Sequence, residues 1–165
     1  TLALLYGASA SERALGAALL RAMASSRIAC AVAVETSVLP RAVELIDAPS
    51  ARPEADTTAA DSSAQLHEQL AVLRALLAVV MGARDAAVTM ALAGAVPRLQ
   101  RLVLRHVAGS GQPTAFEAAA ALLFKLAMHT ELLAHCLQHG VLSTAARVME
   151  KQQGHSGLAA LASEA

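Results

Sequence analysis

The fold can be inferred from the stretch Ala71–Val103, AVLRALLAVVMGARDAAVTMALAGAVPRLQRLV, because two further stretches align with it without a gap. These are Ala14–Ile46, at an offset of 57 residues, and Glu117–Met149, at an offset of 46. Each contains the triplet Ala-Leu-Leu, which begins at Ala18, Ala75 or Ala121. Eighteen residues beyond the last Leu comes a second matching triplet, which is Val38-Leu39-Pro40, Ala95-Val96-Pro97 or Val141-Leu142-Ser143. A fixed internal spacing of this kind is typical of repeat architectures.

Each aligned copy is expected to form three helices, because apolar residues recur within it at spacings of three and four. The first helices are predicted at Ser11–Ala24, Ala64–Met81 and Thr114–Met128. The short second helices are predicted at Ile28–Val34, Asp85–Leu92 and Glu131–His139. We expect Gly94 and Gly140 to end two of these in a left-handed conformation, and Pro40 and Pro97 to open third helices.

No single copy has enough apolar surface to form a core alone, so neighbouring copies must stack. The sequence therefore predicts an all-α fold in which three-helix units build a superhelical rod. Repeat units are expected at residues 11–47, 64–107 and 114–151, with the end of a preceding repeat or an N-terminal flank at 1–10. A mobile insert at 48–63, rich in turn-forming residues, and a connector at 108–113 separate them. Residues 152–165 are expected to form a linker and the start of a further helix.

These residues and spacings resemble the armadillo repeat family. Its pattern has a long helix ending in a motif like A-L-x-N-L-A, then a short helix, then G-(V/A)-(I/L)-P. The matching stretches are Ala121–Ala127, Gly140–Leu142 and, as the closest single match, Ala93–Leu99. The resemblance covers residues 11–151. HEAT repeats, which have two helices per unit, are the repeat family most easily confused with this pattern. It implies a right-handed α-α superhelix whose long helices line a concave groove that binds other proteins.

One departure from the family pattern bears on binding. Members that bind extended peptides clamp the peptide backbone with an Asn on the long helix, and the matching positions here are Ala22, Val79 and Lys125. One turn earlier stand Ala18, Ala75 and Ala121. Ala and Val side chains offer no hydrogen bond to a peptide backbone, whereas a helical ligand forms its backbone hydrogen bonds within itself. We therefore expect a helix or side chains to dock on the stripe of the long helices that faces the groove. Charged contacts are expected from Glu117, Lys125 and His129, and Arg21 and Arg74 flank this stripe.

The composition disfavours several classes of partner. Of the 165 residues 56% are hydrophobic, and 13 Lys+Arg balance 13 Asp+Glu, so no basic field favours nucleic acid or a membrane surface. Tyr6, Phe116 and Phe124 are the only aromatic residues, which disfavours base stacking. Arg74 interrupts the apolar run Leu70–Gly82, so we expect no membrane-spanning helix.

The sequence shows no pattern typical of a catalytic or metal site. Cys30 and Cys136 are far apart without a CxxC spacing, which indicates buried thiols in a reducing compartment and hence a cytoplasmic protein. His135 and His139 share a helix face but lack the Glu of an HExxH motif, so ordinary helix residues are expected rather than zinc ligands. We expect no cofactor, no metal, no small-molecule substrate and no enzymatic activity.

Three functional hypotheses follow from this interpretation. The first is a non-enzymatic scaffold, part of a longer chain, that holds a helical segment of another protein in an Ala-rich groove. The second is a structural segment of a stable cytoskeletal or ciliary assembly, with the groove filled by the rest of its own chain. The third, a transport adaptor that binds basic peptides, is disfavoured by the missing Asn residues.

Overall fold

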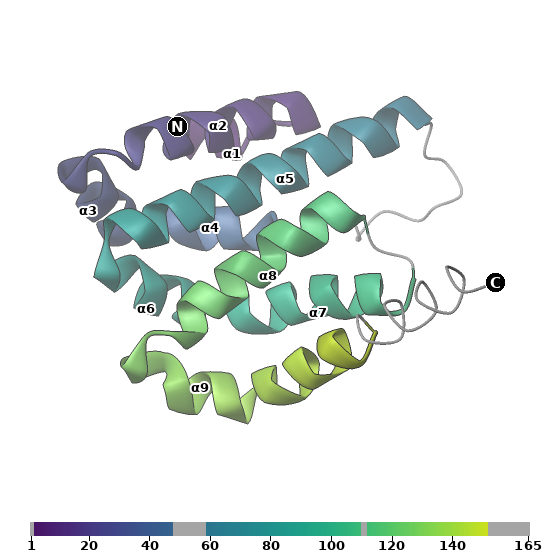
Figure 1. The fold of residues 1–165 in the computed structure, drawn as a ribbon. Coiled ribbons are helices and arrows are strands. Elements are labelled where there is room, and N and C mark those ends of the chain that lie inside the picture. The colour runs from purple at the N-terminus through teal and green to yellow at the C-terminus, as the bar shows by residue number, and fades with distance from the viewer. Residues whose placement is uncertain (1, 48–58, 110–111, 152–165) are drawn as a thin grey trace.

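The computed structural model describes residues 2–47, 59–109 and 112–151. Within these ranges every regular element is a helix and no strand occurs, which confirms the predicted all-α fold (Figure 1). The elements are α1 (Leu2–Leu5), α2 (Ala10–Met23), α3 (Arg27–Glu35), α4 (Val38–Glu44), α5 (Ala59–Gly82), α6 (Arg84–Leu92), α7 (Ala95–Val107), α8 (Pro113–Ala127), the 3-10 helix η3 (Thr130–Leu132) and α9 (Leu133–Gln138). Residues 141–151 are also helical.

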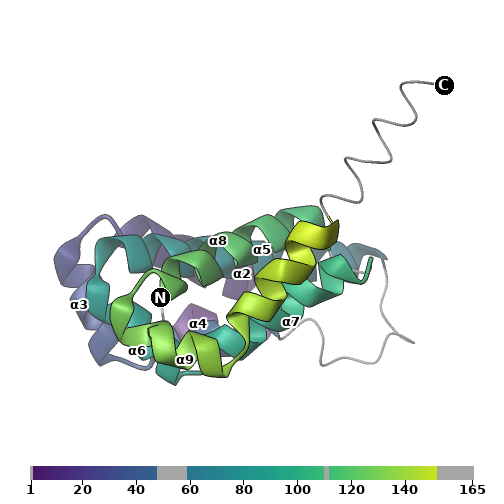
Figure 2. The same ribbon diagram turned by 60° about the horizontal axis from the view of Figure 1, so that its bottom comes forward.

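A first helix followed by two further helices occurs three times along the chain. We call α2–α4 unit 1, α5–α7 unit 2, and α8 with η3, α9 and the 141–151 helix unit 3. The first helices lie side by side in the order α2, α5, α8 and run in the same direction (Figure 1). The short helices α3, α6 and α9 follow them at one end of the molecule (Figures 1 and 2). In the described chain α5 thus has a first helix on both sides, whereas α2 and α8 each have one.

The first helices of units 1 and 3 begin earlier than predicted. The hydroxyl of Ser9, not Ser11, accepts a hydrogen bond from the backbone N–H of Glu12 at 3.2 Å, and the Glu12 carboxylate accepts one from the Ser9 N–H at 3.1 Å. This capping box satisfies two N–H groups at the helix start. Its hydrogen bonds, above all the one from the Ser9 backbone, lower the pKa of Glu12. In unit 3, α8 begins at Pro113, where a missing N–H costs nothing.

The glycines before the third helices behave as the sequence predicts. Gly94 and Gly140 have φ angles of 82° and 73°, in the left-handed region. The helices themselves start earlier than predicted, because α4 and α7 each begin two residues before Pro40 and Pro97. The first four N–H groups of a helix have no intrahelical acceptor, so Pro is tolerated as the third residue.

The Ala-Leu-Leu triplets that relate the three copies do not share one environment. Ala75 and Leu76 of α5 are fully buried, whereas Ala18 of α2 and Ala121 of α8 are exposed. This difference follows from the arrangement, because α5 is flanked by a first helix on both sides. The first two residues of the second matching triplet are buried in units 1 and 2, but Leu142 of unit 3 is 68% exposed.

An ion pair in the interior holds α2 against α5. Glu68 is only 1% exposed, and its two carboxylate oxygens accept hydrogen bonds from Arg13 Nε at 2.6 Å and Arg13 Nη2 at 3.0 Å. Arg13 also donates to the backbone carbonyls of Gly7 and Ala8, each at 3.0 Å. The hydrogen bond to Glu68 raises the pKa of Arg13, so this guanidinium remains charged at every ordinary pH.

Two buried glutamines join neighbouring units through carbonyl groups at helix ends. Gln69 of unit 2 donates to the carbonyl of Ile46 in unit 1 at 2.9 Å. Gln100 of unit 2 donates to the carbonyl of His139 at 2.8 Å and to the hydroxyl of Thr144 at 3.1 Å, both in unit 3. Carbonyls at a helix C-terminus lack an intrahelical donor, so these side chains satisfy groups that would otherwise be buried unpaired.

The start of α5 corrects the predicted insert at 48–63. Residues 59–63 are part of α5, and residues 48–58 lie outside the described residues. In the predicted connector at 108–113, Gly109 has a φ angle of 90° and Pro113 already belongs to α8. The helix start predicted within 152–165 also lies outside the described residues.

Within the residues that the structure describes, one helix is long and apolar enough to cross a membrane by length and composition, contrary to the expectation from the sequence. It is Ser62–Gly82 of α5, and 44% of its most apolar 18-residue window is buried within the fold. Two bent helix pairs, α6 with α7 and α8 with η3 and α9, pass the same test only if each pair is taken as one span. In this fold α5 packs between α2 and α8 and contributes Glu68 to the interior ion pair.

Replacing Arg13 by Met should destabilise the protein by about 3 kcal/mol, because the Glu68 carboxylate is left buried and unpaired. The double variant Arg13→Met/Glu68→Leu should recover most of that loss, since apolar side chains of similar size need no partner. Urea denaturation followed by circular dichroism measures both. The matched control is Arg84→Met, which removes an exposed ion pair with Glu131 and should cost less than about 1 kcal/mol. A double variant no more stable than the single one would contradict this account.

Gly82→Ala should destabilise the protein by about 2 kcal/mol through a steric clash. A Cβ at Gly82 would lie 2.7 Å from the carbonyl oxygen of Ala24 and 3.0 Å from Cys30 Sγ, so the backbone must shift. At Gly94 a Cβ would meet nothing within 4 Å, so Gly94→Ala should cost only the left-handed strain, about 1 kcal/mol. Thermal denaturation compares the two variants, and a larger loss for Gly94→Ala would argue against the close approach at Gly82.

Candidate functional site

The predicted groove residues of α5 do not lie on a surface. Ala75 and Val79 are both 0% exposed. They are buried because α5 packs against α2 on one side and α8 on the other. The prediction that these two residues contact a partner is therefore wrong, and the burial of neighbouring first helices against each other explains the error.

The other six predicted contact residues lie on or next to the outer helices α2 and α8. They differ in exposure, which decides whether a partner can reach them. Ala18, Ala22, Glu117 and Ala121 are exposed, whereas Lys125 and His129 are partly buried.

An exposed stripe follows α8, and the sequence identified only part of it. Glu117, Ala121, Phe124 and Met128 are all exposed and recur at spacings of four, three and four, so they share one face of the helix. Phe124 and Met128 are large apolar side chains that the sequence pattern did not identify as exposed. Their exposure becomes visible only when the neighbours of α8 are known.

A hollow of about 420 Å³ lies between α2 and α5, and we call it the long-helix hollow. It is lined by Arg21, Arg74, Leu77, Ala78 and Met81. The sequence identified the two arginines as flanking residues but not the apolar ones between them. Their spacing on α5, with Arg74 followed by apolar residues three, four and seven positions later, is the signal that could have shown one continuous face.

The charge of the long-helix hollow is positive. No carboxylate in the described part of the chain forms an ion pair with Arg21 or Arg74. The lining residues Leu77, Ala78 and Met81 supply apolar surface and no hydrogen-bond donor. This combination suits a ligand with an apolar stripe and carboxylates beside it.

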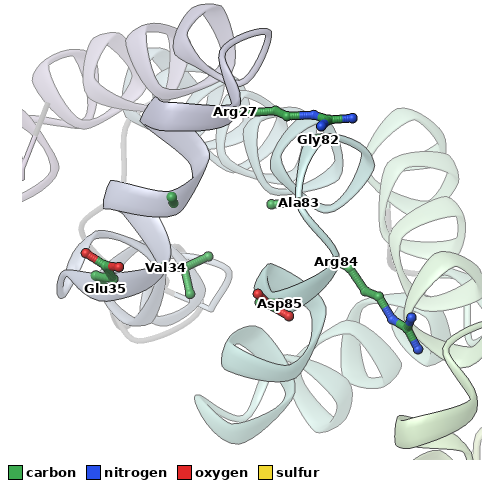
Figure 3. Close-up of a pocket in the computed structure, with 8 residues that line it drawn as sticks. Arg27, Val34, Glu35, Gly82, Ala83, Arg84 and Asp85 are labelled. Carbon is green, nitrogen blue, oxygen red and sulfur yellow. The ribbon is translucent and has the colours of Figure 1, made fainter.

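A second hollow, also of about 420 Å³, opens between α3 and α6. Figure 3 shows Arg27, Val34 and Glu35 on α3 and Asp85 on α6 around it, while the side chain of Arg84 extends away from α3. The hollow is therefore lined by charges of both signs. None of its lining residues is a Ser, Thr, Cys, Lys or His.

The corresponding position between units 2 and 3 is closed by an ion pair. Arg84 Nη2 lies 2.6 Å from Glu131 Oε1 at the starts of α6 and η3. One unit earlier the aligned residues are Arg27 and Asp85, and no ion pair joins them in the described structure. The α3/α6 hollow is thus a junction of two units at which this ion pair is not made.

His135 and His139, which the sequence predicts to be ordinary helix residues rather than zinc ligands, contact each other, and His106 and Cys136 also lie in local contacts. The rings of His135 and His139 meet edge to face at 4.5 Å, and His106 stacks on Phe116 at 4.4 Å. Cys136 is buried, and burial raises the pKa of its thiol. Across the described ranges no group of three or more His, Cys, Asp or Glu is arranged to hold a metal ion.

Comparison with protein-family models, curated proteins and solved structures finds no match to this chain. The armadillo resemblance therefore rests on the residues and spacings of the sequence itself. It remains a prediction, and the candidate sites are argued from their own geometry.

Both thiols should resist alkylation in the native protein and react only after unfolding. Cys30 and Cys136 are 1% and 2% exposed, and the raised pKa of Cys136 lowers its thiolate fraction at neutral pH. Because labelling requires opening of the fold, we expect iodoacetamide to react at least about a hundredfold more slowly with the native protein than with the urea-unfolded chain. Mass spectrometry over time measures both sites. Native labelling of either thiol at the unfolded rate would show that it is accessible.

Proposed function

We propose that this protein is a non-enzymatic scaffold that binds a helical segment of another protein in the long-helix hollow. The observation that carries the proposal is the lining of that hollow. Leu77, Ala78 and Met81 form an apolar strip, and the guanidinium groups of Arg21 and Arg74 stand beside it. Amphipathic helices bind such grooves through apolar side chains at spacings of three and four.

The architecture that we propose is a right-handed α-α superhelix of armadillo-like units. Two features support it. The first helices lie side by side in one direction, and left-handed glycines stand at aligned positions before the third helices of units 2 and 3, at Gly94 and Gly140. In stacked helical repeats, the first helices of neighbouring units form an extended binding surface.

The partner that fits the hollow is acidic and helical. An extended peptide would leave its backbone N–H groups unpaired, because no side chain in the lining offers an oxygen acceptor. A helix satisfies its own backbone and can place carboxylates beside Arg21 and Arg74. Charge-assisted pairs at such a rim mainly set the choice of partner, while the apolar strip supplies buried area.

Two synthetic amphipathic helices with the same Leu stripe, one with Glu and one with Lys on its flanks, test the proposal. We expect the Glu peptide to bind more tightly, as measured by fluorescence anisotropy. In the variant Arg21→Glu/Arg74→Glu the affinity for the Glu peptide should fall by at least about tenfold, because two attractive pairs become repulsive. The preference should then reverse towards the Lys peptide.

The matched control is Arg147→Glu, an exposed Arg on the 141–151 helix outside the hollow, which should leave both affinities within about twofold at physiological salt. Equal binding of the two peptides, or an effect of Arg147→Glu as large as that of the double variant, would overturn the assignment of the hollow. Absence of binding by either peptide would favour the alternative in which this face is filled by the protein's own chain.

A further inference from the structure

Unit 3 ends in an apolar surface, which we call the C-terminal end face. It is formed by large side chains on α9 and the 141–151 helix. They are Leu133 (50% exposed), Leu137 (48%), Leu142 (68%) and Met149 (59%). Four half-exposed apolar side chains on two consecutive helices form more than the scattered exposed residues usual on a protein surface.

The aligned residues of unit 2 are buried. At an offset of 46 residues they are Ala87 (0% exposed), Ala91 (3%), Val96 (0%) and Val103 (2%). Unit 3 packs against this side of unit 2, where α6 contacts η3 and Gln100 donates to Thr144. The C-terminal end face is therefore the same surface that a following unit covers inside the molecule.

Unit 1 is covered on the same side by unit 2. The aligned residues there include Cys30 (1% exposed), Leu39 (0%) and Ile46 (0%). Helix α6 of unit 2 packs on α3 and α4, and Gln69 of α5 donates to the Ile46 carbonyl. Two internal junctions thus bury this surface, and unit 3 alone presents it uncovered in the described chain.

The opposite end of the molecule presents the complementary half of such a junction, which we call the N-terminal end face. It is formed by Leu15 (54% exposed) and Leu19 (41%) on α2. In α5, which has a first helix on both sides, the residues aligned with Leu15 and Leu19 are Val72 and Leu76, both 0% exposed.

We propose that two copies of this chain stack end to end, with the C-terminal end face of one copy on the N-terminal end face of the next. The contact continues the packing already made between units 1 and 2 and between units 2 and 3. A second copy fits because the chain itself contains both halves of the junction. None of these end-face residues lines the long-helix hollow, so the inference stands apart from the proposed partner there.

The contact is head-to-tail, so each copy uses a different face towards each neighbour. Such heterologous contacts do not close on themselves unless the rotation completes a ring. The protein should therefore form dimers and longer oligomers in amounts that rise with concentration. Sedimentation velocity over a range of concentrations measures this distribution.

Two single variants, one on each end face, test the head-to-tail contact. Leu19→Glu places a charge on the N-terminal end face and Leu142→Glu places one on the C-terminal end face. Each variant alone should be monomeric, because every contact needs both faces. Mixed in equal amounts they should form a 1:1 dimer and nothing larger, since only the intact C-terminal face of Leu19→Glu and the intact N-terminal face of Leu142→Glu can meet.

Leu92→Glu is the matched control, because Leu92 is an exposed apolar residue on α6 outside both end faces and outside the long-helix hollow, and it should oligomerise as the wild type does. Circular dichroism checks that each variant is folded, and Leu15→Glu and Met149→Glu replace any that is not. A wild type that stays monomeric at every concentration overturns the proposal. The end faces would then be binding surfaces for a different protein or for further chain. A mixture of the two variants that fails to dimerise overturns it as well, as does oligomerisation of either variant alone.

Discussion

The burial of α5 between α2 and α8 is the constraint on which the other features depend. It places Glu68 in the interior, where a carboxylate is tolerated only with a charged partner and with its oxygens hydrogen-bonded. Arg13 meets both needs with its two-pronged guanidinium, and its remaining N–H groups reach the carbonyls of Gly7 and Ala8. One side chain therefore fixes the spacing of α2 and α5 and the turn that joins α1 to α2.

Much of the fold could be predicted from the sequence because local rules decide it. Apolar periodicity sets where helices form, and the preference of Gly for positive φ sets the turns at Gly94 and Gly140. Helix starts are predicted less accurately, since the sequence pattern favours a start at Ser11 whereas Ser9 and Glu12 form a capping box two residues earlier. The close approach at Gly82 could not be predicted, because it depends on the turn after α2, which is distant in sequence.

The candidate site was predictable only in part, for a related reason. Ala18, Ala75 and Ala121 look alike in sequence, yet Ala75 is buried because α5 has two neighbouring first helices. The helical period gives the apolar face of each helix but not the number of helices that cover it. Arg21 and Arg74 were recognisable as surface charges, whereas the hollow between them exists only once α2 and α5 are packed together.

The two proposals are connected by geometry. Each junction between units brings two first helices together, and the junction of α2 with α5 forms the long-helix hollow. End-to-end stacking would add a junction between α8 of one copy and α2 of the next, and would repeat the existing hollow once per copy along the array. A partner with several acidic helical segments would then bind an oligomer more tightly than a single copy, because each segment after the first binds at a high effective concentration. Oligomerisation would in this way set the strength of partner binding without changing any residue of the hollow.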